Sequence, residues 1–195
     1  MNLVEWIAAG LGLANIALLV RRSVWNYPFG MAMVALYAVV FFEAKLYGEA
    51  GLQLFFFAAQ AWGWVLWARA AGTEAGGGDS QVPVRWMGNL ARLVWATATA
   101  ALALNLGWVM HRFTDASLPY ADAAIAGASI AAQILLGLRR IENWLLWIAI
   151  DVASVAVYVA KGLWPTAALY VVFLGMSALG LREWIAAWKA EEEKA

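Results

Sequence analysis

The 195-residue chain is 65% hydrophobic and only 13% charged, about half the charged fraction of an ordinary soluble domain, so a membrane is its natural solvent. A formal net charge of zero argues against a nucleic-acid partner, because such proteins need a basic surface. The chain has no cysteine and one histidine, which excludes disulfides and leaves no basis for expecting a metal site or another cofactor.

Seven apolar stretches, each about 20 residues long, predict seven transmembrane helices. In chain order they cover residues 3–20, 25–43, 48–68, 90–110, 118–138, 142–160 and 164–187. The first stretch is too long for a removable signal peptide and lacks its basic leading region, so we expect it to remain in the protein. A glycine-rich segment separates the third and fourth spans and predicts a flexible linker.

The first three predicted spans resemble the last three at an offset of 117 residues. Between residues 5–71 and 122–188, 17 of 67 pairs are identical, where composition alone would give roughly 7. Asn26 falls on Asn143, and Trp67 falls on Trp184. A repeat of this length in so apolar a chain is typical of a membrane transporter built from two similar halves.

Three helices, one crossing helix and three more helices would give both halves the same orientation. The predicted fold is therefore an all-α membrane protein with a 3+1+3 parallel repeat, as in the SWEET sugar transporters. Its expected parts are a first repeat (residues 1–71), a cytoplasmic linker (72–89), a linker transmembrane helix (90–112), a second repeat (113–189) and a charged tail (190–195).

Basic residues are distributed unevenly between the two sides of the predicted membrane. Ten of the 13 Lys and Arg residues lie on one side, and only Lys45, Arg112 and Lys161 lie on the other. Because basic residues favour the cytoplasmic side, we expect the amino terminus outside the cell and the carboxyl terminus in the cytoplasm.

Polar and aromatic side chains form one face of the sixth predicted span. At helical spacing they are Asn143, Trp147, Asp151, Ser154 and Tyr158, with Trp144 beside them. One interpretation is a packing face that hydrogen-bonds to neighbouring helices. We favour the second interpretation, the wall of a polar cavity, because an ionised carboxylate near mid-span is costly unless it faces water or a partner.

A second polar and aromatic face lies on the third predicted span. Its residues are Gln53, Phe57, Gln60 and Trp64. We expect this face and the sixth span to meet across one central cavity, with Gln53, Gln60 and Trp64 opposite Asn143, Trp147 and Asp151.

Two further polar positions are candidates for the same cavity. Gln133 in the fifth span is either an interhelical contact, which is the commoner case, or a ligand contact. Tyr37 in the second span occupies the position equivalent to Ser154, and Val34 the position equivalent to Asp151. The halves thus differ at their polar positions, as a ligand without twofold symmetry would require.

Residues 26–67 and 142–184 resemble the two hallmark regions of the PnuC family of bacterial vitamin transporters, and the resemblance extends over essentially the whole chain. The run Glu142-Asn143-Trp144-Leu145-Leu146-Trp147 is similar to the family's Asn-containing WxxW signature. The resemblance implies seven core helices in a SWEET-like fold, a homotrimer in the bacterial inner membrane, and uptake of a vitamin precursor. It also implies facilitated diffusion, made one-way by a cytoplasmic kinase that phosphorylates the cargo.

The substrate implied by the resemblance is nicotinamide riboside in the best-known members, and thiamine or riboflavin in relatives. The family's ligand signature maps onto Asn143, Trp144 and Trp147, whereas Asp151 departs from the amide that nicotinamide riboside carriers often have there. Nicotinamide riboside and thiamine are permanent cations with flat rings, which suit tryptophan faces and a carboxylate. Riboflavin is neutral and larger, and ranks third.

Two other classes of function are less well supported by the residues. An integral membrane enzyme would need a general base or a metal set within the spans, and Asp151 is the lone candidate. A subunit driven by a separate ATPase remains open, although this chain has no phosphate-binding Gly-Lys-Ser/Thr loop of its own. Proton coupling through Asp151 is also open. We therefore expect a passive transporter with no catalytic activity.

Overall fold

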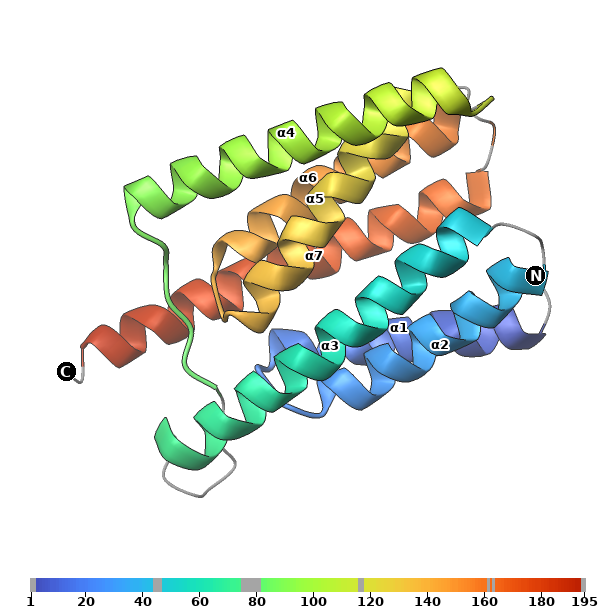
Figure 1. Cartoon of the computed structure of the whole chain (residues 1–195). Helices are drawn as coiled ribbons and strands as arrows, with labels where there is room; N and C mark the ends of the chain where they lie inside the picture. The colour runs from blue at the N-terminus through green and yellow to red at the C-terminus, as the bar shows by residue number, and fades with distance from the viewer. Residues whose placement is uncertain are drawn as a thin grey trace. The chain divides into compact units, whose positions relative to one another are not determined.

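The computed structural model describes residues 3–43, 47–74, 82–115, 118–160, 162 and 164–193. Within these ranges the chain forms seven α-helices and no strands, apart from an isolated bridge between Arg85 and Arg140 (Figure 1). The helices are α1 (Leu3–Val20), α2 (Asn26–Glu43), α3 (Tyr47–Glu74), α4 (Asn89–Phe113), α5 (Pro119–Gly137), α6 (Glu142–Ala160) and α7 (Trp164–Glu192). The predicted all-α class is confirmed.

Helices α3 and α7 are longer than the sequence predicted, at 28 and 29 residues. The expected spans ended at residues 68 and 187, where charged side chains begin to interrupt the apolar run. The helices continue because the residues that follow are rich in alanine and other strong helix formers. Residues 190–192, part of the expected charged tail, lie in the last turn of α7.

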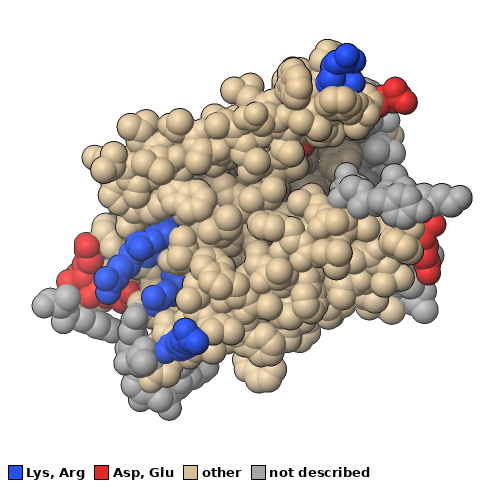
Figure 2. Space-filling model, viewed as in Figure 1, with Lys and Arg blue, Asp and Glu red and all other residues tan. Residues whose placement is uncertain are grey.

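Among the described helices, five are long and apolar enough to cross a membrane: α2, α4, α5, α6 and Ala167–Glu192 of α7. Helix α1 contributes a shorter apolar stretch, Gly10–Val20. On the face that Figure 2 shows, charged side chains gather near helix ends, and most of the visible surface between them is uncharged. On α4, Leu90 and Leu104 are 75% and 64% exposed, which is the pattern of a helix that faces lipid or another apolar surface.

The chain divides into two compact units. Unit 1 comprises Met1–Val84, Leu136–Arg139 and Arg182–Ala195, and unit 2 comprises Arg85–Leu135 and Arg140–Leu181. Unit 1 therefore contains α1, α2 and α3, together with the turn after α5 and the end of α7. Unit 2 contains α4, most of α5, α6 and the greater part of α7. Two short segments of the second repeat thus belong with the first.

Aromatic rings form the core of unit 1. Tyr27, Trp67 and Trp184 are all 0% exposed. The Tyr27 and Trp67 ring centroids are 5.4 Å apart in an edge-to-face arrangement, and those of Trp67 and Trp184 are 5.9 Å apart. Gly63 allows α3 to approach Tyr27 closely, since a Cβ atom at this position would lie 2.8 Å from the tyrosine hydroxyl.

The turns that follow α1 and α5 are the same structure, 117 residues apart. In each, an arginine has a left-handed backbone, with φ of 57° at Arg22 and 60° at Arg139, where glycine is the usual residue. The amide of each arginine donates to the carbonyl three residues earlier at 2.9 Å. The side chains of Asn26 and Asn143 then donate to the carbonyls three residues before them, at 2.7 and 2.6 Å. The repeat seen in the sequence is therefore also a repeat of hydrogen bonds.

Two tryptophans extend this repeat to contacts between distant segments of unit 1. Trp67 Nε1 donates to the Leu136 carbonyl, and Trp184 Nε1 donates to the Leu19 carbonyl, both at 3.2 Å. The donors are 117 residues apart, and so are the acceptors. The third helix of each repeat thus holds the end of the first helix of the other. How the two units are placed, and with it the SWEET-like arrangement, stays a prediction.

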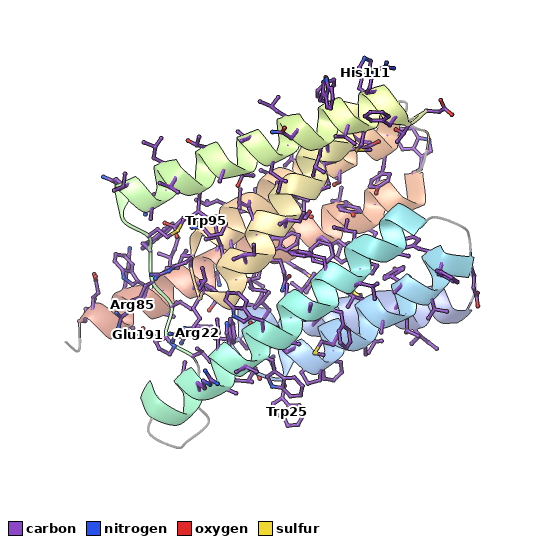
Figure 3. The ribbon with its side chains drawn as sticks, viewed as in Figure 1. Arg22, Trp25, Arg85, Trp95, His111 and Glu191 are labelled. Carbon is purple, nitrogen blue, oxygen red and sulfur yellow. The ribbon has the colours of Figure 1, made fainter. Side chains whose placement is uncertain are left out.

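The described end of the expected linker is held by specific contacts. Val82 and Val84 are 0% exposed. Arg22 exchanges two hydrogen bonds of 3.4 Å with the Val82 backbone and also forms a 2.7 Å ion pair with Glu191 of α7, the neighbouring side chain in Figure 3. The glycine-rich centre of the linker, residues 76–80, lies outside the described residues.

Candidate functional site

The start of α6 is anchored by Glu142 within unit 2. Its Oε1 accepts hydrogen bonds from the Met87 amide at 2.9 Å and from Arg92 Nε at 2.7 Å. Arg92 also lies 5.2 Å from the centre of the Trp86 ring. A negative carboxylate in the first turn also interacts favourably with the positive end of the helix dipole. These contacts hold the first turn of α6 against the segment before α4 and the start of α4.

The polar face predicted for α6 is turned away from the exposed surface. Asn143, Asp151 and Ser154 are 0%, 4% and 1% exposed. Trp147 and Tyr158 are half-buried. Leu145 and Val152, which lie on the same helix but outside the predicted polar face, are 47% and 53% exposed. The helix therefore presents aliphatic side chains outward and its predicted polar face inward.

Asp151 is paired with Ser177 of α7, a residue outside the polar faces predicted from the sequence. Ser177 Oγ donates to Asp151 Oδ2 at 2.9 Å, and each residue is 4% exposed. At the 117-residue offset, Ser177 occupies the position equivalent to Gln60. Extending the repeat comparison to every polar position would therefore have identified Ser177 as a candidate. A carboxylate in an apolar span needs such a donor, because burial without hydrogen bonds is costly.

Several buried polar atoms of unit 2 have no hydrogen-bond partner among the described residues. They include Asn143 Oδ1, Ser154 Oγ and Gln133 Nε2. Leaving such an atom unpaired costs about 1–3 kcal/mol, so each one calls for a water molecule or a ligand group. Unit 2 thus contains unused hydrogen-bonding capacity in the region where the sequence predicted a polar cavity.

Trp144 and Trp147 have different surroundings. Trp144 is 1% exposed, and its ring lies so close to Gly180 of α7 that an added Cβ atom would overlap it. Tyr27 has the same relation to Gly63 in the first repeat, so Trp144 has at least a packing role between α6 and α7. Trp147 is half-buried and keeps part of its surface open. Contact of either ring with a ligand stays a prediction.

Tyr158 belongs to an aromatic cluster of unit 2. Its ring centroid is 5.2 Å from that of Tyr170, which in turn is 5.6 Å from Phe173. The cluster joins α6 to α7 towards the end of α6 opposite Asn143. It offers flat apolar faces on the same helix as the Asp151 carboxylate.

The candidate residues of unit 1 are buried to different degrees. Gln60 is 6% exposed, and its Oε1 lies against Gly30, where any Cβ atom would overlap it. Gln53 is half-buried, whereas Trp64 is 39% exposed. Tyr37 is half-buried and stacks on Phe41, with ring centroids 5.7 Å apart.

The predicted meeting of the α3 and α6 faces involves both units, so it stays a prediction. Within the described ranges, no three His, Asp or Glu side chains gather in a way that could hold a metal ion. The predicted polar face of α6 and its partner on α7 offer the Asp151 carboxylate, hydroxyl and amide groups, and aromatic faces. Such a set suits reversible binding of a polar aromatic ligand.

Known sequences resemble this chain along most of its length. The sequence profile of the family described as "Nicotinamide mononucleotide transporter" matches residues 2–186. The nicotinamide riboside transporter PnuC of Escherichia coli (strain K12) is 29% identical over 209 residues, covering 95% of this chain and 86% of that protein. The riboflavin/roseoflavin transporter RibM of Streptomyces davaonensis is 29% identical over 176 residues, covering 89% and 80%.

A solved structure is similar as well. A crystal structure of the vitamin B3 transporter PnuC matches with a TM-score of 0.78 and 26% sequence identity. The match covers 96% of this chain and 82% of the other. The likeness therefore extends across both units.

Proposed function

Because this chain belongs to the nicotinamide mononucleotide transporter family of membrane proteins, we propose that it carries nicotinamide riboside into the bacterial cell across the inner membrane. The observation that carries the proposal is the buried α6 face, where a carboxylate and aromatic rings lie in a chain related over nearly its full length to a nicotinamide riboside transporter. It acts as a passive carrier and not as an enzyme.

The chemistry of the cargo fits this face. Nicotinamide riboside has a flat pyridinium ring with a permanent positive charge and a ribose with several hydroxyls. A carboxylate attracts the ring charge in a medium of low dielectric constant, so Asp151 is the proposed counter-ion. Trp147 and Tyr158 supply aromatic faces for the cation. Asn143, Ser154 and Gln133 have the unpaired atoms that could bind ribose or carboxamide groups.

The proposed transport needs no energy source within the chain. Because the membrane potential is negative inside the cell, it draws a monovalent cation inward by about 2.3 kcal/mol per 100 mV. A cytoplasmic kinase that phosphorylates the cargo would keep it inside. Asp151 then binds the cation and does not shuttle a proton.

Transport into liposomes tests the proposal. Purified protein should equilibrate labelled nicotinamide riboside without ATP or a pH gradient, and should accumulate it only when a matching kinase and ATP are enclosed. Empty liposomes, and liposomes with the kinase but no carrier, are the controls. Concentrative uptake driven by a proton gradient, at zero membrane potential and without a kinase, would overturn passive transport and implicate Asp151 in proton coupling.

Riboflavin is the second candidate cargo, because the related RibM is a riboflavin/roseoflavin transporter. Riboflavin is neutral, and the buried carboxylate of Asp151 favours a cation, so we rank it below nicotinamide riboside. Thiamine is a cation and remains an alternative on charge alone. Quenching of tryptophan fluorescence by the three vitamins, with equal concentrations tested in parallel, would rank them directly.

Assembly as a homotrimer is also part of the proposal. The exposed apolar side chains of α4, such as Leu93 and Trp108 at 64% and 57%, require a lipid or protein covering. The mass of the detergent-solubilised protein, corrected for bound detergent, distinguishes a trimer from a monomer.

A further inference from the structure

The Asp151 carboxylate is held from one side only. Its Oδ2 accepts the 2.9 Å hydrogen bond from Ser177 Oγ. No described residue donates to the other oxygen, Oδ1. Asn143 Oδ1 and Ser154 Oγ are buried atoms without a hydrogen-bond partner and with almost no accessible surface, whereas Asp151 Oδ1 is not one of these atoms. One carboxylate oxygen is therefore fixed to α7, while the other remains open to a ligand.

The equivalent place in the first repeat has no charge. The 117-residue offset places Val34 at the position of Asp151 and Gln60 at the position of Ser177. Gln60 is buried against Gly30 and brings a neutral amide to this place. A carboxylate that accepts a hydrogen bond from a hydroxyl in the second repeat thus corresponds to a valine and a neutral amide in the first. Of these equivalent positions, only the one in the second repeat carries a charge.

A hydroxyl at Ser177 has a mechanical consequence for Asp151. The terminal torsion of an aspartate is broad, so a carboxylate without a partner samples many orientations. One hydrogen bond to Oδ2 removes most of this freedom and determines where Oδ1 points. Ser177 can donate to a carboxylate without adding charge or bulk between α6 and α7.

We propose that Ser177 is a positioning residue that orients Asp151, and that the Ser177–Asp151 pair selects a cationic ring over a neutral ring of the same shape. The inference rests on the proposed function, because it concerns how nicotinamide riboside is recognised. Serine acts through the carboxylate and does not need to touch the ligand.

The test compares two ligands that differ in charge and hardly in shape. Nicotinamide riboside is the cation, and its 1,4-dihydro form, with the same ribose and carboxamide, is neutral. The measured quantity is the ratio of the two dissociation constants for purified protein. Asp151→Asn should reduce the preference for the cation by roughly tenfold or more, since it removes the attracting charge. Ser177→Ala should reduce it by about fivefold, the equivalent of one ordinary hydrogen bond.

Further variants separate positioning from a general structural role. In the Asp151→Asn background, Ser177→Ala should change the ratio no further, because both substitutions act through the same carboxylate. Ser129→Ala is the matched control, since this buried hydroxyl of α5 donates to the Ile125 carbonyl of its own helix at 2.8 Å. If Ser177→Ala does not fold, Ser177→Cys keeps nearly the same volume with a much weaker donor.

An unchanged ratio in both Ser177 variants, with the parent still binding nicotinamide riboside, would overturn this inference and leave the proposed function standing. Equal losses for the cation and the neutral ligand would do the same, since they would indicate only a packing defect. A parent protein that binds neither ligand would overturn the proposed function itself.

Discussion

Replacing Trp184 by phenylalanine should destabilise the protein by about 1–2 kcal/mol. The indole is 0% exposed, and its Nε1 donates to the Leu19 carbonyl at 3.2 Å. This hydrogen bond contributes about 1 kcal/mol to stability. We do not expect a larger value, because the Leu19 carbonyl also accepts a hydrogen bond from the Arg22 amide. The smaller phenyl ring leaves a void beside Trp67, which adds a cavity cost.

The assay is thermal unfolding in one detergent at one scan rate, since membrane proteins unfold irreversibly and the apparent midpoint depends on the rate. For a chain of this size, 1–2 kcal/mol corresponds to a midpoint lowered by roughly 2–8 °C. Trp67→Phe should give a similar shift, because Trp67 makes the equivalent bond to the Leu136 carbonyl at the same distance. Trp164→Phe is the control: Trp164 begins the same helix as Trp184 but is 65% exposed.

A midpoint shift for Trp184→Phe no larger than that for Trp164→Phe would contradict this prediction. A shift for only one of the two buried tryptophans would also contradict it, because the reciprocal contacts would then not be equivalent. The double variant is informative as well. Since the two rings lie 5.9 Å apart, their separate losses should not add exactly as those of distant sites do.

Three further predictions concern a close contact at a glycine, the rings of the candidate site and the membrane topology. Gly180→Ala should destabilise the protein by roughly 1–3 kcal/mol because the new Cβ atom would overlap the Trp144 ring, whereas Gly175→Ala, with open space around it, should be neutral or stabilising in the same unfolding assay. Trp144→Ala and Trp147→Ala should each weaken nicotinamide riboside binding by about 1–2 kcal/mol through lost cation–π contact, as measured by titration; if only Trp147→Ala does so, the Trp144 ring is packing alone. Reporter fusions should place the carboxyl terminus in the cytoplasm and the amino terminus outside, and an external carboxyl terminus would contradict the topology.

Much of the fold could be predicted from the sequence because its causes are local. Apolar runs long enough to span a bilayer identify the helices, and the bounds of α1, α2, α5 and α6 were predicted to within one residue. The 117-residue repeat was visible because equivalent positions keep the same side chains, and the turns at Arg22 and Arg139 are its structural counterpart. Helical spacing likewise predicted which face of α6 carries Asp151.

Partners of these residues could not be predicted in the same way. Helical periodicity determines the face on which a side chain lies, but not which side chain of another helix meets it. Ser177 is 26 residues from Asp151, and Trp184 is 165 residues from the carbonyl it binds. Contacts at such separations depend on how helices pack and on close approaches at glycines such as Gly63 and Gly180. The sequence by itself determined the helices, the repeat and the polar face, because these follow from local spacing and composition. Only the tertiary structure decided that Ser177 donates a hydrogen bond to Asp151, and that a tryptophan of each repeat donates a hydrogen bond to the other repeat.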